Sequence, residues 1–240
     1  MTTTEVSNRV KGEEGTYVTI TVYRNGEYID FYLERKSIKV YHVETEMLDD
    51  NIGYIELITF DEDCSEEFEA DMDELINQGA TKIILDLRYN TGGLVEEALN
   101  IIDLFVDKGE ITLIEVAADG TETVTTSSND KKYNIEMCIL VNEYTASASE
   151  IVTGALKDYG IASIVGTVTY GKGVIQNVYS LLDGSVLKLT IAEYYTPNRE
   201  QINQVGISPD YEVEIDEENV DEEGNIIDVQ LEKAKEILTN

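Results

Sequence analysis

Continuous apolar runs and amphipathic segments alternate along the middle of the chain. Apolar runs of strand length occur at Ile52–Ile58, Lys82–Leu87 and Ile135–Val141. The run at 82–87 has little polar alternation, which is typical of a strand covered on both faces. Between the runs, apolar residues recur at helical spacing near residues 65–79, 94–106 and 147–159. This alternation predicts an α/β domain with a largely parallel sheet.

The first of these helices has local start and stop signals. Ser65 can cap its first turn, Glu66 and Glu67 suit the positive end of the helix dipole, and Gly79 can end it. A side chain at Phe68 then begins the apolar stripe that faces the sheet.

The N-terminal end of the chain has a different pattern. It predicts a short helix over Thr2–Val10 and two alternating strands, Tyr17–Tyr23 and Tyr28–Leu33. Asn25–Gly26 between the strands favours a type I′ hairpin turn, because both residues tolerate positive φ. One helix and one hairpin bury too little to fold alone, so this segment is interpreted as part of a small domain. A third strand-like run follows at Ile38–Val43.

Two more hairpins and a last helix complete the predicted elements. The hairpins turn at Asp119–Gly120 and at Asp183–Gly184, and residues 194–210 are expected to be irregular. The predicted elements are strands at Ile111–Ala117, Thr121–Thr125, Val174–Leu181 and Ser185–Ala192 and an amphipathic helix at Ile227–Leu238.

The formal net charge of −32 argues against nucleic-acid binding, since phosphates would be repelled and no Lys/Arg stripe is present. The charge is interpreted as an acidic, well-hydrated surface, and the alternative interpretation is a preference for binding basic or neutral polypeptides.

Cys64 and Cys138 have no ligand-like neighbours, which excludes a structural zinc site. No apolar run has the length of a membrane span, and no signal peptide is expected.

Ser147 is the first residue with candidate chemistry. It lies at the predicted start of a helix that follows a buried strand, where backbone N–H groups and the helix dipole favour developing negative charge. An acyl-transfer nucleophile needs that geometry. The structural alternative is a helix cap, with Glu150 completing a capping box.

The usual base for such a serine is missing, because the one histidine, His42, lies far upstream in a strand-like run. Lys172, between Gly171 and Gly173, is the candidate base. A lysine removed from water loses its proton more easily and can then accept the serine proton, and the glycines would let the amine face inward. The alternative is a surface lysine in a glycine turn.

A nucleotide-binding interpretation of Gly166–Gly173 is rejected. The segment nearly matches the phosphate-binding loop G-x-x-x-x-G-K-[ST], but Gly173 stands where the magnesium-binding hydroxyl is required. The residues that follow form a strand pattern where that loop needs a helix.

The turn Asn90–Gly93 follows the strand at 82–87 and precedes a helix. Its two glycines free backbone N–H groups to point at a common spot, as an oxyanion hole requires. A simple helix-start turn is the structural alternative.

Together these segments resemble the carboxyl-terminal processing (tail-specific) proteases of serine peptidase family S41. The resemblance extends over about residues 38–238. It is carried by Leu85–Arg88, Asn90–Gly93, Thr145–Ile151, Gly171–Gly173 with Gln176, Tyr194–Pro197 and Gly206–Asp210.

The resemblance implies a ClpP/crotonase-like core and a Ser/Lys dyad that needs neither metal nor cofactor. Ser147 would be the nucleophile, Lys172 the base and Gln176 the residue that orients the lysine. Gly92 or Gly93 would form the oxyanion hole with Ala148. Asp158 and Glu150 would give support, and the strand from Val174 would pair with an extended substrate.

The resemblance also implies an endopeptidase that cleaves polypeptides near exposed C-terminal tails, located outside the cytoplasm. Residues 1–36 would be the C-terminal part of an incomplete PDZ-like domain, and residues 37–240 the peptidase core with a C-terminal helix. The oligomeric state is left open. A non-catalytic peptide- or lipid-binding module on the same fold, as in retinoid-binding relatives, is the competing hypothesis.

Overall fold

The computed structural model describes residues 1–37, 41–215, 220 and 226–239. The chain divides into two compact units, Met1–Tyr41 and His42–Asn240, which are described separately. Much of the predicted strand Ile38–Val43 lies outside the described residues. A strand, β3, begins at Val43 and runs to Met47.

The first unit contains the predicted helix and hairpin. Helix α1 (Thr3–Val10) is followed by β1 (Tyr17–Arg24) and β2 (Glu27–Glu34), which pair antiparallel. The turn residues Asn25 and Gly26 both have positive φ, as predicted. The Arg35 guanidinium donates hydrogen bonds to the carbonyls of Val10 and Tyr17 and so ties the helix to the hairpin.

A six-stranded sheet organises the second unit, in the order β12-β9-β8-β5-β4-β3. All of its neighbouring strands pair parallel except β3, which pairs antiparallel to β4. The predicted, largely parallel sheet is therefore confirmed. Its strands are β3, β4 (Ile52–Leu57), β5 (Lys82–Asp86), β8 (Glu136–Val141), β9 (Ala162–Gly166) and β12 (Tyr211–Glu212).

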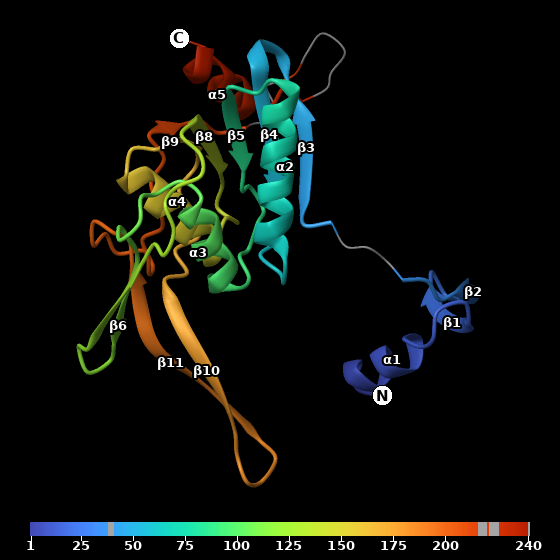
Figure 1. Ribbon diagram of the computed structural model, residues 1–240. Coiled ribbons are helices and arrows are strands. Elements are labelled where there is room, and N and C mark those ends of the chain that lie inside the picture. Colours follow the sequence, from blue (N-terminus) through green and yellow to red (C-terminus); the bar gives the residue numbers. More distant parts are fainter. Residues whose placement is uncertain (38–40, 216–219, 221–225, 240) are drawn as a thin grey trace. The chain divides into compact units, whose positions relative to one another are not determined.

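Both faces of this sheet are covered (Figure 1). Helices α2 (Cys64–Gln78), α3 (Val95–Asp103) and α4 (Ala148–Asp158) pack on one face, and α5 (Val229–Thr239) packs on the other. In β5, Ile83 and Leu85 join the core under α2–α4, whereas Ile84 joins the core under α5. Successive strand side chains point to opposite faces, which explains why this run lacks polar alternation.

The two predicted hairpins join into a second, antiparallel sheet of order β10-β11-β6-β7. β11 pairs with β6 as well as with β10, so this sheet unites segments that the sequence presents as separate hairpins. Part of the β10–β11 hairpin extends away from the body of the unit (Figure 1). The four strands are β6 (Ile111–Ala117), β7 (Glu122–Thr126), β10 (Val174–Ser180) and β11 (Val186–Tyr195).

Three local predictions were wrong. Asp63, in a left-handed conformation, precedes helix α2, and Ser65 lies inside the helix with its backbone N–H bonded to Glu97. Helix α3 ends at Asp103, before the predicted Val106. β11 extends to Tyr195, into the segment expected to be irregular, because its last residues pair with β6. In the part of the chain that the structure describes, no helix combines the length and hydropathy needed to span a bilayer.

Candidate active site

Ser147 is the residue immediately before helix α4, in the loop that leaves β8. Its backbone has φ 60° and ψ −118°, a region that residues with a Cβ rarely occupy. Backbone strain of this kind persists only where neighbouring contacts impose it, and it concentrates at functional sites. The side chain is half-buried.

The carboxylate of Glu150, which is 0% exposed, imposes this geometry. Its Oε2 accepts hydrogen bonds from the backbone N–H groups of Ser147 and Lys172, each at 2.9 Å. Its Oε1 accepts bonds from the Thr169 hydroxyl and the Gly171 N–H, each at 2.6 Å. Because one oxygen binds both nitrogens, the backbone nitrogens of Ser147 and Lys172 lie no more than twice 2.9 Å apart. The two candidate dyad residues are therefore neighbours in space.

Lys172 lies between two buried glycines that pack against the loop at 202–206. A Cβ on Gly173 would lie 2.3 Å from the Asn203 nitrogen, and one on Gly171 would lie 3.0 Å from the Gly206 nitrogen. The glycines are thus required by close backbone approach. Lys172 itself is exposed, so the dehydrated amine expected from the sequence is not present in this conformation.

The turn at 90–93 packs directly on Ser147. A Cβ on Gly92, whose φ is +94°, would lie 2.7 Å from Ser147 Cβ and 2.8 Å from the Ala148 nitrogen. The Gly92 N–H is bonded to the Asn90 side chain at 2.9 Å. Within the described residues, the N–H groups of Gly93 and Ala148 donate to no protein acceptor. Of the predicted oxyanion donors, Gly93 and Ala148 are therefore the two that are available.

Buried polar side chains tie the turn to the loop that carries Ser147. The Asn90 carbonyl accepts bonds from the Ala146 N–H and the Ser149 hydroxyl, at 3.0 Å each. The Asn142 side-chain oxygen accepts from the N–H groups of Tyr89 and Tyr144. The carboxyl ends of β5 and β8 are thus joined into one rigid rim.

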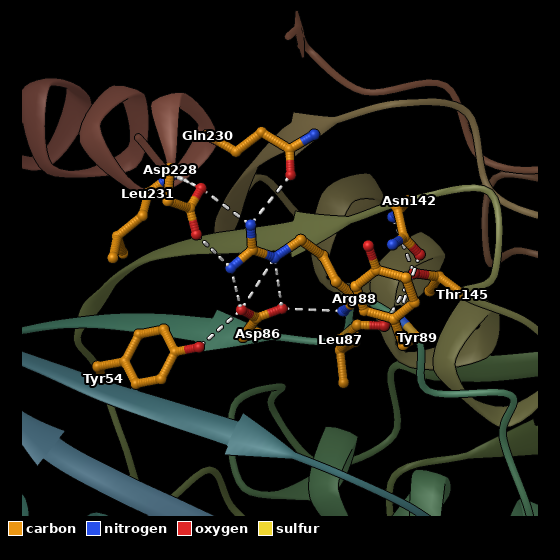
Figure 2. A network of polar contacts seen from close by, with 10 residues as sticks. All are labelled: Tyr54, Asp86, Leu87, Arg88, Tyr89, Asn142, Thr145, Asp228, Gln230 and Leu231. Carbon is orange, nitrogen blue, oxygen red and sulfur yellow. Dashed lines mark hydrogen bonds and ion pairs between the residues drawn. The ribbon is translucent and has the colours of Figure 1, made fainter. Parts of the chain in front are cut away.

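Arg88 connects this rim to the C-terminal helix (Figure 2). Its guanidinium binds the Asp86 carboxylate at 2.6 Å and the Asp228 carboxylate at 2.8 Å, and it also donates to Gln230. Burial acts to lower the pKa of Arg88, but the hydrogen bonds from its guanidinium to Asp86 and Asp228 outweigh burial and raise it. The Tyr54 hydroxyl completes the network with a bond of 2.7 Å to Asp86.

Two predicted residues lie apart from this cluster. The amide of Gln176, on β10, is exposed and donates to the Thr190 hydroxyl at 3.2 Å. In the described contacts it has no bond to Lys172. Asp158 is the last residue of α4, at the opposite end of the helix from Ser147, and it accepts the Asn198 N–H at 2.7 Å.

The sequence profile of Peptidase family S41 matches residues 51–213, more than half of the chain. The chain belongs to peptidase family S41.

Relatives with curated descriptions support this assignment. A probable CtpA-like serine protease from Staphylococcus aureus is 40% identical over 212 residues, which are 88% of this chain and 42% of the relative. A protein of the same description from Staphylococcus epidermidis is 38% identical over 211 residues, covering 87% and 43%. The chain spans about two-fifths of the length of these S41 relatives.

Solved structures of S41-type proteins have the same fold. The photosystem II D1 C-terminal processing protease has a TM-score of 0.66 and 30% identity, covering 89% of this chain and 60% of that one. A putative S41 protease from Bacteroides fragilis, at 18% identity, has a TM-score of 0.68 and covers 93% and 65%. The second likeness concerns the fold alone.

Several residues of this candidate site have no role predicted from the sequence. Asn90 and Thr169 supply buried hydrogen bonds, and Tyr194 on β11 reaches Lys172 with its hydroxyl. Asn90 and Tyr194 lie within the motifs that carry the family resemblance, and this position in the motifs is the sequence signal that could have identified them. Within residues 1–37, 41–215, 220 and 226–239, no three His, Cys, Asp or Glu side chains group as metal ligands do.

Proposed function

We propose that residues 42–240 form the catalytic core of a serine endopeptidase that cleaves polypeptides near their C-termini, with Ser147 and Lys172 as the dyad. The observation that carries the proposal is the shared bond to Glu150 Oε2, which brings the backbones of Ser147 and Lys172 together at the start of α4.

In the first step the Ser147 hydroxyl attacks the carbonyl carbon of the scissile peptide. The neutral amine of Lys172 takes the hydroxyl proton as the new C–O bond forms. The lysine is exposed here, and a substrate lying over it would exclude water, which favours the uncharged amine. Gln176 is proposed to orient that amine after substrate binds.

The negative charge that forms on the carbonyl oxygen would be stabilised by the N–H groups of Gly93 and Ala148, with Gly92 as the spacer against Ser147. The dipole of α4 favours the same charge. Collapse of the intermediate breaks the C–N bond, and the leaving amine takes the proton back from Lys172. Water then releases the acyl group from Ser147 and regenerates the hydroxyl. This chemistry needs neither metal nor cofactor.

The edge of β10 would hold the substrate. β10 is the outer strand of its sheet and begins two residues after Lys172. An extended peptide adding to this edge would pass the dyad with its main chain paired. Polypeptides with exposed C-terminal tails are the proposed substrates. By family analogy the protein acts outside the cytoplasm.

The test is a cleavage assay with an unstructured polypeptide that has an apolar C-terminal tail, read by mass spectrometry. Ser147→Ala and Lys172→Ala are each expected to abolish cleavage, while Lys188→Ala, at an exposed lysine of β11, retains it. Circular dichroism shows whether each variant is folded. Turnover by a folded Ser147→Ala or Lys172→Ala variant would remove the mechanism.

A non-catalytic peptide- or lipid-binding module is the second candidate. The exposed Lys172 and the bond of Gln176 to Thr190 favour it, because neither side chain is engaged with Ser147. A binding module would retain the peptide intact at equal affinity in the wild type and in Ser147→Ala. An enzyme would release shortened products only in the wild type.

A further inference from the structure

The peptide bond between Gly92 and Gly93 is held against a buried segment of the core. The Gly92 carbonyl accepts the Phe60 N–H at 3.2 Å, and the Phe60 carbonyl accepts the Leu94 N–H at 2.7 Å. Phe60 is 0% exposed and forms a bridge with Gly93. The bond is trans, and in a planar trans peptide the C=O and N–H groups point in opposite directions. The Gly93 N–H is therefore directed away from Phe60.

Asn90, which is 1% exposed, holds the same turn with its side chain. The side-chain oxygen accepts the Gly92 N–H at 2.9 Å, and the side-chain nitrogen donates to the Leu57 carbonyl at 2.6 Å, at the end of β4. These two partners fix the orientation of the amide, since a backbone N–H needs an acceptor and a carbonyl needs a donor. Gly92 is buried with its N–H occupied, whereas Gly93 is exposed and, in the described part of the chain, its N–H has no protein acceptor.

The main chain of Asn90 contacts the other half of the predicted oxyanion hole. Its carbonyl accepts the Ala146 N–H and the Ser149 hydroxyl, each at 3.0 Å. These two residues flank the start of α4, where Ala148 is the first helical residue. Asn90 therefore fixes the turn of Gly93 with its side chain and the loop of Ala148 with its carbonyl.

We infer that Asn90 is a positioning residue that fixes the Gly92–Gly93 peptide so that the Gly93 N–H, and not the Gly92 N–H, faces the oxyanion. The inference rests on the proposed function, because an oxyanion forms only when Ser147 attacks a carbonyl. Without the Asn90 side chain the Gly92 N–H would be released, and two adjacent glycines have wide conformational freedom to reorient. Loss of one oxyanion donor lowers kcat about 10²- to 10³-fold.

The test uses the full chain, with a peptide aldehyde and the matching peptide alcohol as inhibitors. Ser147 Oγ adds to the aldehyde carbon as its proton passes to Lys172, and the aldehyde oxygen then lies in the oxyanion hole. The alcohol forms no bond to Ser147. For Asn90→Ala we expect kcat to fall about 10²-fold with KM within about threefold of wild type. Affinity for the aldehyde is expected to fall by a similar factor, and affinity for the alcohol to change less than about twofold.

Two further variants separate positioning from a loss of stability. Asn90→Ser keeps a weaker acceptor for the Gly92 N–H but is shorter toward Leu57, so its kcat should exceed that of Asn90→Ala. Equal kcat values for these two variants would assign the effect to the Leu57 bond and overturn the inference. Tyr133→Phe, which loses a hydroxyl bond to Asp73 on α2, should lower the unfolding temperature and leave both inhibitor affinities unchanged.

If Asn90→Ala does not fold, glycolic acid at position 92 replaces it. This ester removes the Gly92 N–H and keeps every side chain, including the Asn90 amide and its bond to Leu57. A weaker preference for the aldehyde over the alcohol supports the inference, and an unchanged preference overturns it. A folded Asn90→Ala variant that matches the wild-type kcat and aldehyde affinity overturns the inference alone. A wild-type chain that neither cleaves peptide nor prefers the aldehyde overturns the proposed function, and the inference with it.

Discussion

Glu150 Oε2 accepts the backbone N–H of Lys172 at 2.9 Å, although 22 positions separate the two residues in the sequence. The same oxygen binds the Ser147 N–H, so one buried carboxylate joins the two candidate catalytic segments. Glu150 was predicted as the second half of a local capping box. The structure gives it a second role, which is to hold the Thr169–Lys172 segment against the start of α4.

Glu150→Gln is expected to destabilise the fold by about 3 kcal/mol, because an amide cannot accept at both positions. Whichever way the amide is turned, its NH₂ group would face a backbone N–H donor. Activity is expected to fall at least 10²-fold, since the segments of Ser147 and Lys172 would separate. Urea unfolding and the cleavage assay measure the two effects.

Glu143→Gln is the control for this substitution, at an exposed glutamate in the loop before Ser147. It should leave both stability and activity unchanged. Equal effects of the two substitutions would show that the buried carboxylate has no special role.

Gly92→Ala is expected to abolish cleavage, because its Cβ would lie 2.7 Å from Ser147 Cβ and displace the nucleophile. Gly120→Ala is the matched control, since Gly120 also has positive φ (+84°) but a Cβ there meets nothing within 4 Å. Both variants should lose about 1–2 kcal/mol from backbone strain. Thermal unfolding measures the stability lost to backbone strain, and the peptide assay measures the activity lost when Ser147 is displaced. Active Gly92→Ala would contradict the packing argument.

The Asp228–Arg88 pair predicts a pH-dependent contribution to stability. Burial acts to raise the pKa of Asp228, but hydrogen bonds from Arg88 and from the Leu231 N–H outweigh it, so the folded pKa lies below the unfolded value. The contribution is therefore fully present above the unfolded pKa and is lost as pH falls through the folded pKa.

Asp228→Asn should accordingly reduce the free energy of unfolding at pH 7 by about 1 kcal/mol, since its side chain is 34% exposed. The difference from wild type should shrink below about pH 4. Urea unfolding across this range measures it, and Glu122→Gln, in an exposed pair with Arg199, is the control. A difference that grows in acid would contradict the assigned direction.

Substrate pairing along β10 predicts sensitivity to the peptide main chain. A peptide with N-methyl groups on alternate residues loses the N–H donors that strand addition requires. We expect its cleavage to slow at least 10-fold relative to the unmethylated peptide, and methylation of the intervening residues to slow it less. Equal rates for all three peptides would argue against strand addition at this edge.

The sequence alone determined the elements whose signals are local. The apolar run at 82–87 predicted a doubly covered strand, and Ile83 and Ile84 do face different cores. Asn25–Gly26 predicted its hairpin turn, and Gly79 predicted the end of α2. The motifs around Ser147, Gly92 and Lys172 also identified the family. Periodicity and turn chemistry act over a few residues, so they can be read without the fold.

Tertiary structure decided the contacts between distant segments. Three such contacts depend on the order of strands in a sheet and on which face each helix covers. They are the bond of Glu150 to Lys172, the pairing of β11 with β6, and the ion pair of Asp228 with Arg88. The positive φ of Ser147 and the exposure of Lys172 are likewise outcomes of packing. No local pattern encodes such contacts, because their energy comes from groups that become neighbours only once the core has formed.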